Sequence, residues 1–234
     1  MALPKLESPS YTMTIPSTGK AVEYRPFNVK EQKTLLLAKE SDDEQAMVRA
    51  TRDLITSCVV TPIDVNKLTL FDFEFMFLQV RAKSVGETSD IQIKCHDCGE
   101  FNPITINLEE AKVLGEVQKD NKIELTDTIG LLMSYPMFES SMRLISQRKS
   151  DTEAAFSTLI DCIDAIYDES AVYTAEDTPR KELVEFIDQL SNKQFEAVTD
   201  FINSSPVIGL EVNFNCTKCE VLNEETITGL KNFF

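Results

Sequence analysis

The chain has a single histidine, His96, and lacks the glycine-rich motifs that mark nucleotide sites. With one histidine, neither a serine triad nor a cysteine triad has an obvious general base. There is no GxGxxG motif, and the STGKA segment lacks the earlier glycine of a phosphate-binding loop. We therefore expect a protein that is not an enzyme.

Basic residues are also scarce, because 23 lysines and arginines stand against 39 aspartates and glutamates, a formal net charge of −16. Nucleic acid and anionic lipid carry the same sign of charge, so a broad electrostatic grip on either is disfavoured. Carboxylates are too abundant for a pair of them to indicate catalysis. The composition favours a protein or a metal as the partner.

No apolar run approaches the ~20 residues that span a bilayer. Residues 1–15 lack the basic start and apolar centre of a signal peptide. Hydrophobic residues make up 42% of the chain, enough for a substantial core. We expect a soluble protein of a reducing cytoplasm, where six cysteines are more often free thiols or metal ligands than disulfides.

The first third of the chain predicts a β-hairpin followed by helices. Asn28 and Glu31 fit a capping box. Four alternating phenylalanines, from Phe71 to Phe77, would suit a strand, but the good helix formers that follow favour a helix. The predicted elements are strands Tyr11–Ile15 and Ala21–Tyr24, a helix to Lys39, a helix with Met47, Ala50, Leu54 and Cys58 on one face, and a helix from about Thr69 to Lys83.

Residues 109–206 carry no strong strand signal and predict a helical insertion. Ala155, Leu159, Cys162 and Ile166 are spaced as one apolar helical face, which assigns Cys162, like Cys58, to the core. Two further helices are predicted over Pro179–Gln189 and Asn192–Asn203, with Thr178 and Ser191 as their caps.

Two CxxC motifs carry the clearest chemical signal. Cys95 and Cys98 lie between two strand-like segments, and so do Cys216 and Cys219. A tight turn directs both sulfurs of a CxxC to one point, and two such turns facing each other supply the four thiolates of a structural Zn²⁺ site. We therefore predict that all four cysteines bind one zinc ion.

Other interpretations of the motifs stay open. The 117 residues between Cys98 and Cys216 far exceed the ~15–20 of an ordinary zinc ribbon, although loop-closure entropy grows only slowly with length. The two turns could instead be metal-free or form disulfides. A redox CxxC needs a helix start, which Asn102 and Pro103 disfavour. His96 could replace a cysteine ligand, but an exposed turn residue is the simpler interpretation.

The predicted fold class is α+β and mainly helical, with an N-terminal β-hairpin and a zinc-ribbon-like pair of β-hairpins interrupted by a helical insertion. The corresponding domains are residues 1–87, the two ribbon hairpins at 88–108 and 207–230, and the insertion at 109–206. At the chain end, Leu230, Phe233 and Phe234 should either pack on the protein's own helices or serve as a docking tag.

Several segments together resemble the baseplate hub and hub-assembly protein family of T4-like phages. They are VEYRPFNVKEQKTLLLAKES, FDFEFMFLQVRAKSVGE, FIDQLSNKQFEAVTDFINSSP with the CTKC after it, and the terminal GLKNFF. The resemblance implies a non-enzymatic, chaperone-like assembly factor or hub subunit that binds phage hub or tail proteins. It would be made in the host cytoplasm, with a possible place in the virion tail. The alternative is a zinc-ribbon nucleic-acid-binding or transcription accessory protein, which should have a basic stripe beside the ribbon.

Overall fold

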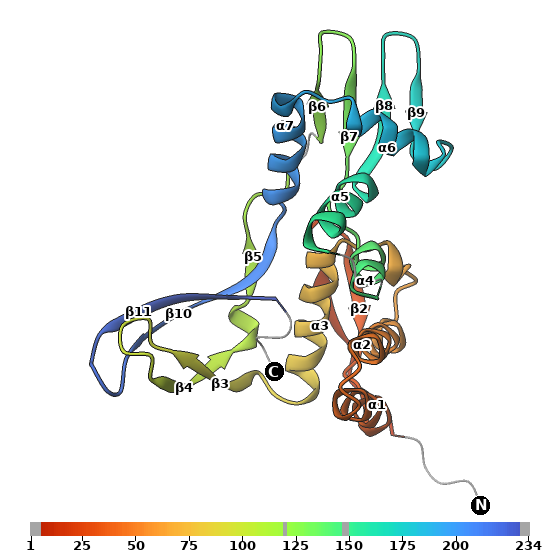
Figure 1. The fold of residues 1–234 in the computed structure, drawn as a ribbon. Helices are drawn as coiled ribbons and strands as arrows, with labels where there is room; N and C mark the ends of the chain where they lie inside the picture. The colour runs from red at the N-terminus through yellow and green to blue at the C-terminus, as the bar shows by residue number, and fades with distance from the viewer. Residues whose placement is uncertain (1–5, 119–120, 147–149, 230–234) are drawn as a thin grey trace, which may run out of the picture. The chain divides into compact units, whose positions relative to one another are not determined.

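The computed structural model describes residues 6–118, 121–146 and 150–229, and its ribbon is drawn in Figure 1. The chain divides into two compact units. Among the described residues, the first unit comprises 6–65, 71–114 and 207–229, and the second comprises 66–70, 115–118, 121–146 and 150–206. Segments from both ends of the chain therefore build the first unit. None of the described helices has both the length and the apolar character needed to cross a bilayer.

The N-terminal hairpin and the helices after it follow the predicted order. The elements are β1 (Tyr11–Thr14), β2 (Ala21–Tyr24), α1 (Val29–Glu40), α2 (Glu44–Cys58), the short 3-10 helix η1 (Val65–Lys67) and α3 (Leu70–Ser84). The capping box predicted at the start of α1 is confirmed, because Asn28 accepts from the Lys30 N–H while Glu31 accepts from the Asn28 N–H.

The phenylalanine-rich segment forms α3, which confirms the helix prediction. Phe71, Phe73, Met76 and Phe77 are all buried. Buried residues lie on several faces of α3, so its apolar residues do not follow a single stripe. This explains why the sequence pattern also suited a strand.

Two long hairpins complete the first unit. The strands are β3 (Thr88–Lys94), β4 (Phe101–Asn107), β5 (Lys112–Leu114), β10 (Val207–Asn215) and β11 (Leu222–Thr228), with the 3-10 helix η2 (Leu108–Glu110) after β4. The pair β3–β4 forms a two-stranded antiparallel sheet, and β5 adds to the β10 edge of the second hairpin. In Figure 1 the hairpin β10–β11 lies beside β3–β4 despite its distance along the chain.

The second unit combines helices with a four-stranded antiparallel sheet of order β6-β7-β8-β9. Its strands are β6 (Lys122–Glu124), β7 (Gly130–Met133), β8 (Ile163–Tyr167) and β9 (Val172–Thr174), and its helices are α4 (Phe138–Ser146), α5 (Asp151–Asp161), α6 (Arg180–Asp188) and α7 (Asn192–Asn203). The capping box at Ser191 and Gln194 begins α7. At α6, Pro179 is the cap rather than the first helical residue.

The prediction of a mainly helical fold with a helical insertion is wrong. The described residues form seven α-helices and eleven β-strands in four sheets, a mixed α+β fold. The sheet of the second unit was missed because its strands are three to five residues long, too short for a clear two-residue period. Ile166 continued the helical spacing of Leu159 and Cys162 by coincidence, because α5 ends at Asp161 and Ile166 lies in β8.

The predictions for the chain end fall outside the described residues, since Leu230, Phe233 and Phe234 belong to the segment that the structure does not describe.

Candidate metal centre

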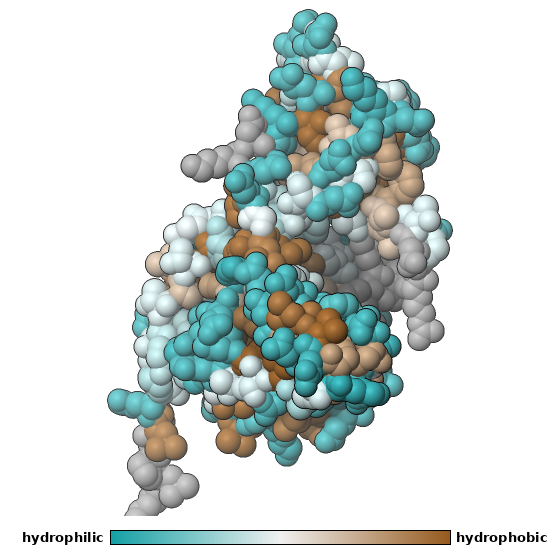
Figure 2. Space-filling view, turned by 90° about the vertical axis from the view of Figure 1, so that its left-hand side faces the viewer, coloured by the Kyte–Doolittle hydropathy of each residue, from teal (hydrophilic) through white to brown (hydrophobic). Residues whose placement is uncertain are grey.

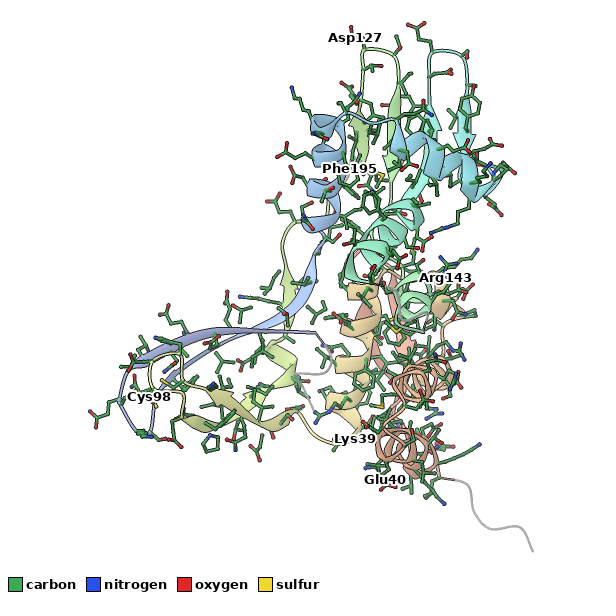
Figure 3. The ribbon with its side chains drawn as sticks, in the orientation of Figure 1. Lys39, Glu40, Cys98, Asp127, Arg143 and Phe195 are labelled. Carbon is green, nitrogen blue, oxygen red and sulfur yellow. The ribbon has the colours of Figure 1, made fainter. Side chains whose placement is uncertain are left out.

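The four CxxC cysteines lie together where the turns of the two long hairpins meet. Cys95 and Cys98 occupy the turn between β3 and β4, where Figure 3 labels Cys98, and Cys216 and Cys219 occupy the turn between β10 and β11. All four Sγ atoms lie within 4.8 Å of one another. The sequence therefore identified a real cluster of thiols across a separation of more than a hundred residues, and their role as metal ligands stays a prediction.

The sulfur spacing matches a metal site better than a disulfide. Cys95 Sγ lies 3.7 Å from Cys219 Sγ, and Cys98 Sγ lies 3.6 Å from Cys216 Sγ. A disulfide would bring two sulfurs to about 2.05 Å, and all six cysteines of the chain are free thiols. Four sulfurs at the tetrahedral Zn–S distance of about 2.3 Å are separated by about 3.8 Å. The cluster thus has the dimensions of a closed four-sulfur site.

Each turn is held by the same backbone hydrogen bonds. In the first, the Gly99 N–H donates to the Cys95 carbonyl at 3.0 Å, and the Cys95 N–H donates to Glu100 at 2.8 Å. The residue after the second cysteine of each turn has a positive φ, 73° at Gly99 and 60° at Glu220. This conformation turns the chain back into the next strand. The second turn repeats the pattern, with Glu220 N–H to the Cys216 carbonyl at 3.0 Å and Cys216 N–H to the Val221 carbonyl at 2.9 Å.

The thiols of the cluster differ in acidity. Backbone N–H groups of Cys219 and Lys218 hydrogen-bond to Cys216 Sγ and lower the pKa of Cys216 to about 6. The Val221 N–H acts in the same direction on Cys219, but burial and the neighbouring sulfurs outweigh it and raise the pKa of Cys219 to about 12. Crowded sulfurs cannot all ionise by themselves, and a bound cation would allow all four to be thiolates.

Each CxxC turn forms a knuckle, and backbone N–H groups also set the acidity of the cysteines in the first knuckle. The Cys98 N–H, and after it the Asp97 N–H, lower the pKa of Cys95. The Glu100 N–H lowers the pKa of Cys98, but burial and the neighbouring sulfurs outweigh it and raise that pKa, so the first cysteine of each knuckle is the more acidic one. His96 is exposed in this turn, and the group of potential metal ligands found among the described residues contains the four cysteines and not His96.

The other two cysteines belong to the core, as predicted. Cys58, the last residue of α2, and Cys162, the cap of α5, are 0% and 1% exposed. Burial raises the pKa of Cys58 to about 11 and that of Cys162 to about 12. Both thiols should be protonated and unreactive at neutral pH.

Two residues of the site were missed by the sequence reasoning. Asn102 and Asn223 are 1% and 0% exposed, although asparagine is seldom fully buried. Each stands seven positions after the first cysteine of its own knuckle, so the repeated motif is CxxCxxxN and not CxxC alone. This repeat was the signal that could have revealed them.

Comparisons with known proteins agree over nearly the whole chain. A family model described as "T4 bacteriophage base plate protein" matches residues 8–234. The baseplate hub assembly protein gp26 of Enterobacteria phage T4 is 24% identical over 225 residues, which cover 96% of this chain and 97% of the phage T4 protein. No solved structure matches the chain.

Proposed function

The chain belongs to the T4 bacteriophage base plate protein family, and we propose that it is a non-enzymatic assembly factor of the baseplate hub that acts by binding other phage tail proteins. The end-to-end correspondence with the phage T4 hub assembly protein carries this proposal, because the alignment covers 96% of one chain and 97% of the other. The alignment thus covers nearly all of both sequences, which favours a shared role over a single shared domain.

Charges around the two hairpins favour a protein partner over nucleic acid. Lys218 forms an ion pair with Glu100 at 3.0 Å, and Lys112 forms one with Glu211 at 2.8 Å. These lysines are partly neutralised and do not form the basic stripe that a nucleic-acid-binding ribbon needs. On the face drawn in Figure 2, hydrophilic residues are interspersed with several apolar patches. The zinc-ribbon nucleic-acid alternative is accordingly not favoured.

The four-cysteine cluster supports a structural Zn²⁺ ion bound by Cys95, Cys98, Cys216 and Cys219. Sulfur donors in tetrahedral spacing suit Zn²⁺, and iron is the other metal that favours such a set. Four protein ligands leave no open position for a substrate or a catalytic water, so the ion would stabilise the fold. The two turns would hold the ion between them, with Cys95 and Cys216 buried and Cys98 exposed at the surface.

The rate at which the cysteines are alkylated provides a direct test of the proposed metal centre. In zinc-loaded native protein, alkylation of the four ribbon cysteines should be slow, and removal of zinc with a chelator should make it fast, because the thiolate is the reactive species and the metal occupies it. Cys58 and Cys162 should react only after unfolding. Mass spectrometry of peptides from protein alkylated before and after chelation measures this. Equal reactivity of the four ribbon thiols in both samples would contradict the metal centre.

An assembly factor and a permanent hub subunit differ in where the protein ends up. We propose the assembly factor, because a formal net charge of −16 suits reversible association better than a permanent apolar interface. We expect the protein in infected-cell lysate bound to hub or tail precursors, and its absence from purified virions. Quantitative mass spectrometry of both fractions tests this. A fixed number of copies per virion would instead establish a hub subunit.

A further inference from the structure

The two knuckles are joined by a reciprocal pair of buried asparagines. Asn102 is the second residue of β4, and Asn223 is the second residue of β11. The strands β4 and β11 have the same alternation of buried and exposed positions, and the strand register beside the knuckles is also the same, since Lys94 pairs with Phe101 and Asn215 pairs with Leu222. The two hairpins are thus equivalent in structure around these asparagines.

Each asparagine first closes its own knuckle. Asn102 Nδ2 donates to the Glu100 carbonyl at 3.0 Å, and Asn223 Nδ2 donates to the Val221 carbonyl at 2.9 Å. These two carbonyls are the ones that also accept the N–H of the first cysteine of each knuckle. The side-chain amide therefore supports the peptide group that fixes the position of that cysteine.

Each asparagine then reaches across to the opposite knuckle. Asn223 Oδ1 accepts the His96 N–H at 3.0 Å. Asn102 Oδ1 accepts the Thr217 N–H at 2.8 Å and the Thr217 hydroxyl at 2.9 Å. His96 and Thr217 are the residues directly after the first cysteines, so the two cross-links occupy equivalent places.

We propose that Asn102 and Asn223 are positioning residues that hold the two knuckles in register, so that four thiols meet at one point before a metal ion binds. The inference deepens the proposed metal centre and rests on it for its function. Each buried amide donates to a carbonyl of its own turn and accepts an N–H of the opposite turn, so a side chain with only one of these capacities cannot replace it. The asparagines thereby link segments that lie more than a hundred residues apart.

Both asparagines also reach the first cysteine of the opposite knuckle, since Asn223 makes a side-chain hydrogen bond to Cys95. Asn102 Nδ2 also lies 3.7 Å from Cys216 Sγ, within hydrogen-bonding distance for sulfur. A donor to a metal-bound thiolate tunes the metal through its ligand. Loss of either asparagine should therefore change the electronic spectrum of a Co²⁺-substituted protein.

The test uses the full chain with Asn102→Ala and Asn223→Ala, and Asn213→Ala as the control. Asn213 is an exposed asparagine in β10 of the same hairpin. Loss of a group that hydrogen-bonds to the metal ligands typically costs about 10–100-fold in metal affinity. We therefore expect zinc release to a chromogenic chelator to become about 10- to 100-fold faster in Asn102→Ala and Asn223→Ala protein. The control should release zinc at the parental rate.

Amide hydrogen exchange in metal-free protein separates positioning from general destabilisation. In Asn102→Ala the Thr217 amide should lose protection while the His96 amide keeps it, and Asn223→Ala should show the reverse. If either alanine variant fails to fold, the matching serine variant replaces it. Unchanged zinc release together with unchanged protection of both amides would overturn the inference. If the parent protein binds no metal, the metal centre fails, and the exchange pattern still decides whether the asparagines hold the knuckles.

Discussion

Cys216→Ser protein is expected to lose most of its metal and to melt at a lower temperature than the parent protein, which should carry about one zinc per chain. Structural zinc contributes ~10–16 kcal/mol of apparent binding energy in small peptides, comparable with the ~5–15 kcal/mol that stabilises a whole domain. The asparagine hydrogen bonds and the Lys218–Glu100 ion pair also join the two turns, but each contributes far less than a bound ion, so loss of the ion should loosen the first unit.

The size of the effect can be bounded. A loss of about 3–5 kcal/mol would lower the melting temperature by about 6–20 °C, since one kcal/mol corresponds to about 2–4 °C in a chain of this size. Elemental analysis measures the metal, and circular dichroism measures the melting. Cys58→Ala is the matched control, because it also removes a buried thiol but leaves the cluster intact. It should keep its zinc and lose far less stability.

Two results would contradict the prediction. The first is a parent protein that contains neither zinc nor iron when prepared without chelator. The second is Cys216→Ser protein that retains a full equivalent of metal. Iron in place of zinc would preserve the four-sulfur centre and change only the identity of its ion.

Local chemistry explains which parts of the structure could be predicted. The capping boxes at Asn28 and Ser191 depend on residues three positions apart, so the sequence contains the whole interaction. The CxxC knuckles are equally local, and their repetition indicated that the two turns meet. The long hairpins also have enough residues to show alternation between buried and exposed positions.

Features that depend on distant partners could not be predicted in this way. The β6–β9 sheet consists of short strands whose pairing is set by their neighbours and not by their own pattern. Asn102 acquires its role from Thr217, which lies 115 positions away. A single asparagine after a β-turn has no distinctive spacing, and only comparison of the two CxxC repeats could have singled it out.

A phage that cannot make this protein is expected to accumulate tail parts without a completed hub, while its DNA synthesis and head assembly continue. The family membership motivates this expectation, and a role limited to protein binding explains why the defect should be confined to tails. Electron microscopy and sedimentation of lysates from the null phage would measure heads, tail parts and complete particles. Plasmid-borne parent protein should restore particles, and Cys58→Ala protein should do so nearly as well.

The Cys216→Ser protein links the metal centre to the biological role in the same experiment. If the knuckles are needed for hub assembly, this variant should restore far fewer particles than Cys58→Ala protein present at the same level. Restoration by both would separate the ion from assembly while leaving the assembly role intact. Normal tails from the null phage would contradict the assembly role itself. Altered transcripts together with salt-sensitive DNA or RNA binding would instead support the nucleic-acid alternative, because counterion release makes such binding strongly dependent on salt.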